Sequence, residues 1–139
     1  MGKHTLEIEY DYDFVLIGIS SHEKDYRICW ALNNKLGLDL VKTEPLEIKD
    51  KKQEEHSHFS LFSFERPDEF MEYFIIANRS EKGLLIPEQK QVDYFFIIRG
   101  EMEDEAAIEV VKQIKEINLV QTAFRIDVTS LKSKQNLIL

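Results

Sequence analysis

Residues 92–128 read VDYFFIIRGEMEDEAAIEVVKQIKEINLVQTAFRIDV, and this stretch indicates how the chain folds. The run from Val92 to Ile98 is apolar, as in a buried strand, and Arg99-Gly100 closes it. Acidic residues then crowd the first turn of a predicted helix, whose positive dipole end favours them. Apolar residues recur along this helix at helical spacing: Ala107, Val111, Ile114 and Ile117. Asn118 is the predicted end of the helix, and the alternation over 120–128 predicts another strand.

The N-terminal part of the chain has the same strand and helix pattern. Alternating apolar and acidic residues over 5–13 predict a first strand, and the apolar run 14–19 is either its continuation or a second strand buried on both faces. The serines at 20–21 can cap a helix from His22 to Leu36, and Gly37 provides its left-handed end. Apolar residues again recur at helical spacing in this segment: Ile28, Leu32 and Leu36.

The middle of the chain contains strands and one polar stretch. Four strands are predicted there: 38–48, 59–64, 72–77 and 92–98. Pro45 interrupts the first of them, which favours an edge strand or a bulge, because proline donates no ladder hydrogen bond. The polar stretch from Lys49 to His56 has few apolar residues to anchor it, so we predict a mobile loop.

These elements predict a single α+β domain over residues 1–139, in the order β-α-β-β-β-β-α-β. We expect a two-layer sandwich, with a mainly antiparallel sheet of about six strands and both helices on one face. A ferredoxin-like arrangement with an inserted hairpin is one way to connect these elements.

Charge and composition argue against several classes of function. The chain has 18 basic and 26 acidic residues, and its net charge of -8 opposes binding to nucleic-acid phosphates. No stretch approaches the roughly 18 consecutive apolar residues of a membrane span, so no membrane contact is expected. The single cysteine, Cys29, excludes an intramolecular disulfide and fits a reducing compartment, so we expect a cytoplasmic protein.

Few residues indicate catalysis or a cofactor. The five glycines never cluster into a phosphate-binding loop, and no serine lies in a G-x-S-x-G elbow, so we predict no cofactor and no catalytic set. Cys29 lies in an apolar run, where a buried structural thiol is favoured over a nucleophile. His56 and His58, with Glu54 or Glu55, have a spacing that suits a metal ion. We favour two exposed histidines at the end of a loop and predict no metal site.

The first predicted helix carries an unusual stripe formed by Tyr26, Trp30 and Asn33. If the stripe packs on the sheet, it is part of the core and the indole N–H has a partner, which is the interpretation we favour. The alternative is an exposed ridge that binds another molecule. Tyr26 and Trp30 are therefore candidate binding residues.

The connection from Ile86 to Tyr94 holds Pro87, Glu88 and Asp93 where a strand begins, a position at which loops often present functional groups. These residues have structural interpretations too, since Pro87 can fix the turn and Glu88 can bind backbone donors. The nine residues, IPEQKQVDY, are similar to the motif of the IPExxxVDY family of small bacterial proteins. Further stretches are also similar to that family: 14–20, 25–33 and 131–138. The resemblance implies a bacterial cytoplasmic protein and no particular activity, cofactor or catalytic residue.

The leading hypothesis is a noncatalytic protein-binding or adaptor domain with an unidentified protein partner, and self-association into a homodimer is a further expectation. The candidate binding residues are Ile86, Pro87, Glu88, Val92, Asp93, Tyr94, Tyr26 and Trp30. The alternative is a small enzyme with Glu88 and Asp93 as acid and base and His22 or His56 nearby. A third hypothesis is a site for a small apolar ligand, lined by Phe62, Phe64, Phe95 and Trp30.

Overall fold

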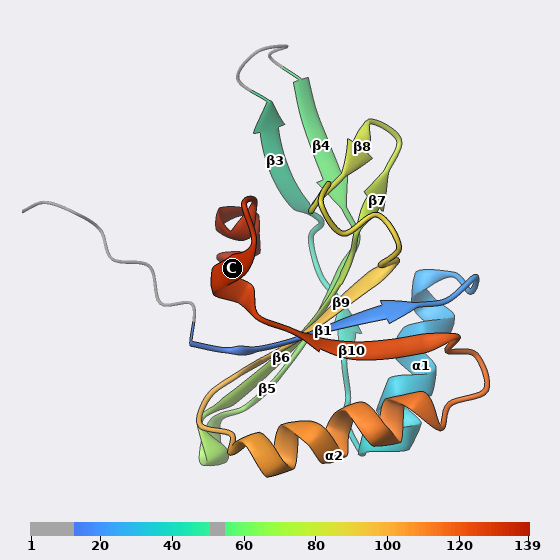
Figure 1. Ribbon diagram of the computed structural model, residues 1–139, viewed down its shortest axis with the longest axis vertical. Helices are drawn as coiled ribbons and strands as arrows, with labels where there is room; N and C mark the ends of the chain where they lie inside the picture. The colour runs from blue at the N-terminus through green and yellow to red at the C-terminus, as the bar shows by residue number, and fades with distance from the viewer. Residues whose placement is uncertain (1–12, 51–54) are drawn as a thin grey trace, which may run out of the picture.

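The structure, a computed structural model, describes residues 13–50 and 55–139. Its centre is a six-stranded sheet in the order β10-β1-β9-β6-β5-β2, with every neighbouring pair antiparallel (Figure 1). The strands are β1 (Val15–Ser20), β2 (Val41–Lys42), β5 (Leu61–Arg66), β6 (Met71–Ala77), β9 (Tyr94–Arg99) and β10 (Thr122–Ile126). The predicted α+β class and mainly antiparallel sheet are confirmed. The part of the first predicted strand over residues 5–12 lies outside the described residues.

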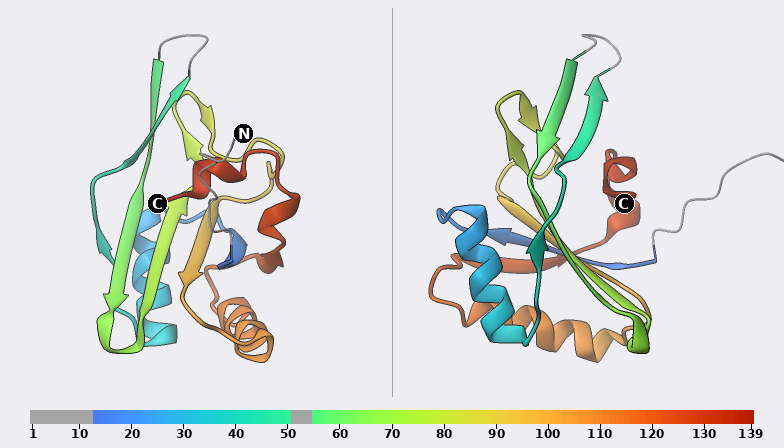
Figure 2. Two further views of the ribbon diagram at one scale, coloured as in Figure 1. Left: turned by 90° about the vertical axis from the view of Figure 1, so that its left-hand side faces the viewer. Right: turned by 180° about the vertical axis from the view of Figure 1, so that it is seen from behind.

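Helices α1 (Asp25–Leu36) and α2 (Asp104–Lys115) lie on the same side of the sheet, as predicted (Figures 1 and 2). With β1, β6, β9 and β10 they form a β-α-β-β-α-β unit in which the fourth strand lies beside the first. Gly37 ends α1 in the left-handed conformation, with φ 67°. The predicted end of α2 is wrong, because the helix ends at Lys115 and its capping residue is Glu116, in a right-handed conformation, rather than Asn118.

Both faces of the central strands are buried, because apolar residues continue through consecutive positions. Val15, Ile17 and Ile19 of β1 belong to the cluster beneath the helices, whereas Leu16 belongs to a separate cluster on the other face. The sheet therefore has a second covered face. Among the described residues, no α-helix covers this face.

Irregular segments and a short hairpin cover that second face. They are the hairpin of β3 (Leu46–Asp50) with β4 (Glu55–Phe59), the connection 85–93, and the 3-10 turns η2 (Val128–Ser130) and η3 (Lys134–Leu137). A second hairpin, of β7 (Arg79–Ser80) with β8 (Gly83–Leu84), leads into the connection 85–93. Leu131 and Leu137 are 5% and 2% exposed, so the C-terminal segment is packed into the core. The predicted loop 49–56 is wrong at both ends, where β3 and β4 pair; residues 51–54 lie outside the described part.

The two edges of the six-stranded sheet differ. At one edge β2 is only two residues long, and Pro45 follows it before β3, which agrees with the predicted edge position. At the other edge β10 is five residues long. In the residues that the structure describes, no helix has the length and apolar character needed to cross a membrane.

Candidate functional site

The Ile86 to Tyr94 connection is fastened to the sheet by Asn78, which follows β6 and is fully buried. Its Nδ2 donates to the carbonyl oxygens of Gln89 at 2.9 Å and Val92 at 2.8 Å. Its Oδ1 accepts a hydrogen bond from the backbone N–H of Ile86 at 2.8 Å. One side chain thus satisfies three backbone groups of an irregular segment that crosses the core.

The apolar members of the motif are core residues. Ile86 and Val92 are both 0% exposed and pack in the cluster on the second face of the sheet. Gly18 of β1 makes room for Val92, since a Cβ at position 18 would lie 2.9 Å from Val92 Cγ2. Pro87 is exposed at the turn. Of these three candidate binding residues, only Pro87 reaches the surface.

Glu88 holds the C-terminal segment in place. Its Oε2 accepts from the Ser133 backbone N–H at 2.8 Å, and its Oε1 accepts from the Ser133 hydroxyl at 3.0 Å. Asn136 adds a third contact, from its Nδ2 to the Leu85 carbonyl oxygen at 2.8 Å. Desolvation acts to raise the pKa of Glu88, but the hydrogen bonds that the carboxylate accepts, with those from Ser133 among them, outweigh it and lower the pKa below its usual value. An ionised acceptor of this kind is suited to binding donors rather than to donating a proton.

Asp93 and Tyr94 fix the residues that lead into α1. Asp93 Oδ2 accepts from the Ser21 backbone N–H at 2.8 Å, and its Oδ1 accepts from Arg79 Nε at 2.9 Å. The Tyr94 hydroxyl donates to the Glu23 carbonyl oxygen at 2.5 Å. Burial, with smaller contributions from nearby carboxylates, raises the pKa of Tyr94 to about 12, so its hydroxyl stays protonated.

These residues border a hollow of about 480 Å³, called the Asp93 hollow below. It is lined by Ser21, His22, Glu23, Lys24, Asp25, Ser60, Ala77, Arg79, Asp93 and Tyr94. Asp25 accepts from the Ser60 hydroxyl at 2.5 Å and from the Tyr26 backbone N–H at 2.7 Å. Of the predicted catalytic residues, His22 and Asp93 line this hollow, whereas Glu88 and His56 do not. The structure therefore does not bring the predicted acid and base together.

The favoured core position of Tyr26 and Trp30 is wrong. These side chains are 59% and 63% exposed on the outer face of α1. The helix instead buries its aliphatic face through Ile28 and Leu32, which are 0% exposed. A helix can bury one stripe against a sheet, so residues on its opposite side remain in solvent. Tyr26 and Trp30 are called the aromatic ridge below. Tyr26 directly follows Asp25, which lines the Asp93 hollow.

Cys29 and Asn33 connect α1 to the chain beyond it. The Cys29 thiol donates to the Leu40 carbonyl oxygen at 3.4 Å, and burial is the main cause that raises its pKa to about 11. Asn33 bonds both backbone groups of Leu40, at 3.1 and 2.8 Å. The predicted burial of Cys29 is confirmed, because its side chain is 5% exposed.

The two histidines of the predicted metal motif lie on strand β4 and not on a loop. His56 Nδ1 contacts Oε1 of Glu47 on the paired strand β3, and His58 Nε2 lies 3.3 Å from Oε2 of the same carboxylate. The hydrogen bond from His56 is the main cause that lowers the pKa of Glu47. Among the described residues, no cluster of three side chains is arranged to hold a metal ion, and Glu54 lies outside them.

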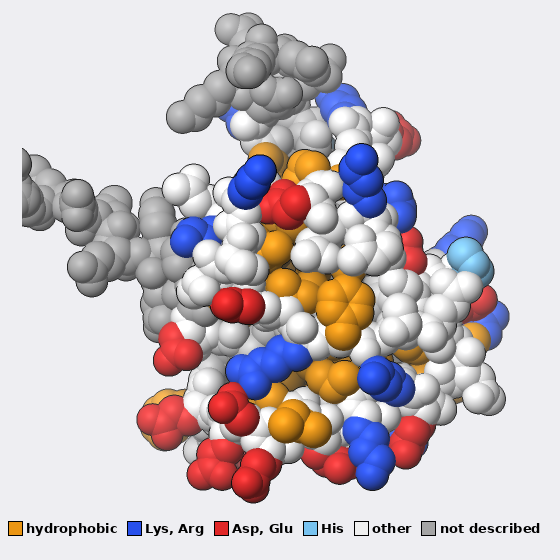
Figure 3. All heavy atoms as spheres, in the orientation of Figure 1, with side chains coloured by type: hydrophobic (Ala, Val, Ile, Leu, Met, Phe, Trp, Pro, Cys, Tyr) orange, Lys and Arg blue, Asp and Glu red, His pale blue; other side chains and the backbone are white. Residues whose placement is uncertain are grey.

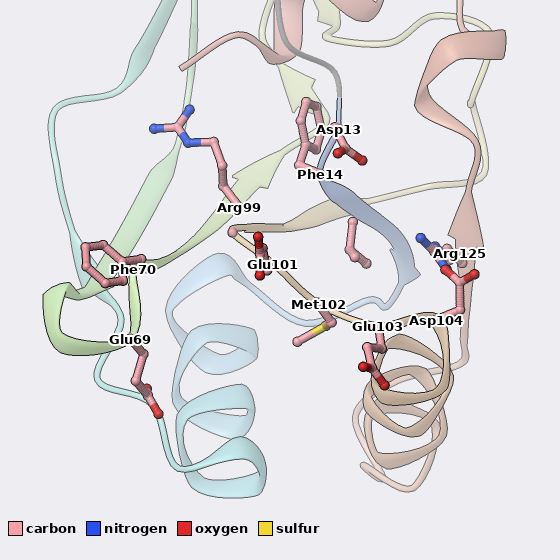
Figure 4. Close-up of a pocket in the computed structure, with 12 residues that line it drawn as sticks. Asp13, Phe14, Glu69, Phe70, Arg99, Glu101, Met102, Glu103, Asp104 and Arg125 are labelled. Atoms are coloured by element: carbon pink, nitrogen blue, oxygen red, sulfur yellow. The ribbon is translucent and has the colours of Figure 1, made fainter.

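A larger hollow of about 980 Å³ lies at the other end of the sheet (Figure 4). Phe70 borders it from the turn between β5 and β6, and Arg99, Glu101 and Asp104 border it from the end of β9 and the start of α2. Arg99 bonds Glu72 at 2.9 Å within the sheet. Sequence reasoning missed Phe70, which is 87% exposed and has a left-handed φ of 56°.

The sequence also gave little sign of the residues that fasten the motif. Neither Asn78 nor Ser133 is among the candidate residues predicted from the sequence. An asparagine directly after an apolar strand is the one signal that could have indicated a buried side chain with backbone partners. Arg79 follows it and gave no distinct signal.

The predicted apolar-ligand site is wrong. Phe62 belongs to the cluster beneath the helices and Phe95 to the cluster on the opposite face, while Trp30 lies on the surface. These residues cannot line one cavity.

Comparisons of this chain with known protein families, with curated proteins and with solved structures found no match. The resemblance to the IPExxxVDY family therefore stays a prediction.

Proposed function

We propose that this chain is a noncatalytic protein-binding domain that contacts its partner through the aromatic ridge and the adjoining Asp93 hollow. The observation that carries the proposal is the exposure of Tyr26 and Trp30, at 59% and 63%, on a helix whose other face is fully buried. Tyrosine and tryptophan are enriched at protein interfaces and supply a large share of binding energy there. The ridge offers two such side chains one helical turn apart, beside a concave surface.

In this proposal, the motif supports the binding surface from beneath. The hydrogen bond that Asp93 accepts from Ser21 and the one that Tyr94 donates to Glu23 hold the segment before α1 against the end of the sheet. The direction of α1, and with it the ridge, depends on that segment. The motif residues thus act as positioning residues, and the ridge makes the contact.

The enzymatic alternative lacks comparable support. Glu88 and Asp93 each accept two hydrogen bonds from within the chain. A general acid and base must reach the same reacting atom, and only one of these two carboxylates borders the Asp93 hollow.

We place this domain in the bacterial cytoplasm. The support is Cys29, the single cysteine of the chain, which is buried as a free thiol. The family resemblance of the Ile86 to Tyr94 motif points the same way.

The test begins with capture from a lysate of the source organism, using the native chain and a Tyr26→Ala, Trp30→Ala variant as baits. Phe70→Ala is the matched control, because it removes an even more exposed aromatic side chain from a different surface. Circular dichroism of each bait confirms that it is folded. The captured protein is then purified and titrated against each variant.

We expect a partner that binds the native chain and the Phe70→Ala control with the same affinity. Its affinity for the double variant should be lower by a factor of about thirty or more. Trp30 is the sole tryptophan of the chain, so its emission reports the ridge directly and should shift to the blue as the partner covers it. A partner that binds all three baits equally, or that leaves Trp30 emission unchanged, would contradict the proposal.

A further inference from the structure

We infer that the surface formed by α2 and the edge strand β10 binds a second copy of this chain in a two-fold dimer. This surface does not include the aromatic ridge, so the inference stands whether or not the proposed function is right. It is argued from the edges of the sheet, from the side chains of α2 and from the hollow between α2 and β10.

The two edges of the sheet are unequally protected. An edge strand exposes unpaired backbone groups, and proteins block such edges with short strands, lysines and prolines. The β2 edge has all three features, because β2 is two residues long, includes Lys42 and is followed by Pro45. The β10 edge has five residues, Thr122–Ile126, with one charged side chain, Arg125, and neither lysine nor proline. It is the edge that can still accept a strand.

The side of α2 next to β10 is complementary to itself, although one of its residues, Val111, is partly buried against the core. Asp104, Ile108, Val111 and Lys115 follow one another at steps of four, three and four residues, so they form a single stripe. A two-fold axis through the middle of this helix exchanges Ile108 with Val111 and Asp104 with Lys115. Two copies of α2 that pack antiparallel therefore place apolar residues together at the centre and opposite charges together at both ends.

The surface between α2 and β10 has the shape and charge for that contact. Ile108 is 64% exposed, and with Val111 and Arg125 it borders a hollow of about 270 Å³, which Lys112 and Lys115 flank. Figure 3 shows this face, with apolar side chains over α2, basic ones around them, and acidic ones gathered at one end of the molecule. Asp104 bonds Arg125 at 2.8 Å, yet its side chain is 83% exposed, which leaves room for a second cation from the partner copy.

α2 and β10 have nearly the same length, so a single two-fold axis can pass beside the midpoints of both elements. At the usual rise per residue, the 12 residues of α2 span about 18 Å and the five residues of β10 about 17 Å. Antiparallel pairing of β10 with its symmetry mate would continue the sheet through both copies. The occupant is a second copy because the charge pattern is matched by the same helix in reverse.

The experiment is sedimentation equilibrium of the full chain over a concentration series, with charge reversals at both ends of the stripe. In the Asp104→Lys variant each end of the interface pairs two cations, and in the Lys115→Glu variant each end pairs two anions. Each change occurs twice in a two-fold dimer. We therefore expect the dimer dissociation constant of each variant to rise by a factor of about ten or more. An equimolar mixture of the two variants pairs opposite charges at both ends again, and dimers should return.

Ile108→Asp removes the apolar centre and should abolish the dimer, with circular dichroism confirming the fold. Glu65→Lys is the control, because it reverses an exposed charge on β5, away from α2 and β10. Hydrogen exchange of the β10 amides should slow as the native chain is concentrated. A native chain that stays monomeric throughout the series overturns the inference. So does a dimer that persists in the Ile108→Asp variant, or a mixture that fails to restore dimers.

Discussion

The two faces of the central sheet are buried in different ways. Beneath α1 and α2 the contact is made by apolar side chains, and the helices satisfy their own backbone groups. On the other face the covering segments are irregular, and polar side chains satisfy their backbone groups instead. Asn78, Glu88 and Asn136 do this work, with partners up to 51 residues away. The comparison teaches that polar residues carry stability where a core is covered without helices.

The largest effect should come from Asn78→Leu, which breaks the fastening of the second face. The change leaves the Ile86 N–H and the Val92 carbonyl group buried without these partners and removes one of the two hydrogen bonds to the Gln89 carbonyl, at a cost of about 3–5 kcal/mol. Urea unfolding followed by far-ultraviolet circular dichroism measures the loss. Fluorescence is unsuitable, because Trp30 is already exposed in the folded chain.

Asn33→Leu is the matched control on the helix face. Asn33 also bonds two backbone groups, but it is only partly buried, so water can replace the lost contacts at a cost of about 1 kcal/mol. Equal losses at Asn33 and Asn78 would show that the two faces do not differ in the way described.

Ile114→Ala tests the sheet face that α1 and α2 cover, where apolar packing makes the contact. Ile114 is 0% exposed in α2, so truncation should leave a cavity and cost about 2–4 kcal/mol in the same unfolding measurement. Ile108→Ala on the exposed side of α2 is the control and should change the free energy of unfolding of the monomer by less than about 0.5 kcal/mol. A small effect at Ile114 would mean that α2 is loosely packed.

Glu88→Gln should loosen the C-terminal segment without unfolding the sheet. The exposed carboxylate makes two bonds to Ser133, so its loss should cost about 1 kcal/mol. Hydrogen exchange should accelerate at the Ser133 amide and stay unchanged at Leu16. Faster exchange at both positions would show that the segment and the sheet open together.

The same contact should depend on pH. The pKa of Glu88 is lower in the folded chain than its usual value of 4.5, so the contribution of Glu88 is complete above the unfolded pKa. It is lost as the pH falls through the lower, folded pKa. Acid should therefore accelerate opening at Ser133 in the native chain, after correction for intrinsic exchange. The Glu88→Gln variant should lack this response.

The smallest effect should be a gain, from Phe70→Asn. Phe70 is 87% exposed and has a left-handed backbone, which asparagine tolerates better than phenylalanine. Stability should rise by about 0.5 kcal/mol in urea unfolding. Asp68→Asn, in the same turn without a positive φ, should leave stability unchanged. A loss at position 70 would reveal that the Phe70 ring packs in solution.

Periodicity predicted the helices and the central strands because apolar spacing reports which residues face a core. It missed the β3 and β4 hairpin, where His56 and His58 both contact Glu47 on the paired strand. It also placed Trp30 in the core, because Trp30 is hydrophobic. The helix has two stripes of apolar side chains, and only the aliphatic stripe is buried. Ile28 and Leu32 define that stripe.

The motif was located by sequence, but its contacts were not. Glu88 and Ser133 are 45 residues apart, and Asp93 and Ser21 are 72 residues apart. Such pairs depend on how the sheet is ordered in space. Local composition carries no information on that order, so the sequence alone does not distinguish a structural motif from a binding motif.

The burial of Asn78 has a consequence for how this protein can be produced. Asn78-Arg79-Ser80 matches the acceptor sequence for N-linked glycosylation, a bulky modification of the asparagine side-chain amide. In the folded chain that amide is fully buried and donates to two carbonyl groups. A sugar attached during passage through a secretory pathway would trap the chain before it folds, and Ser80→Ala would remove the acceptor sequence while sparing Asn78.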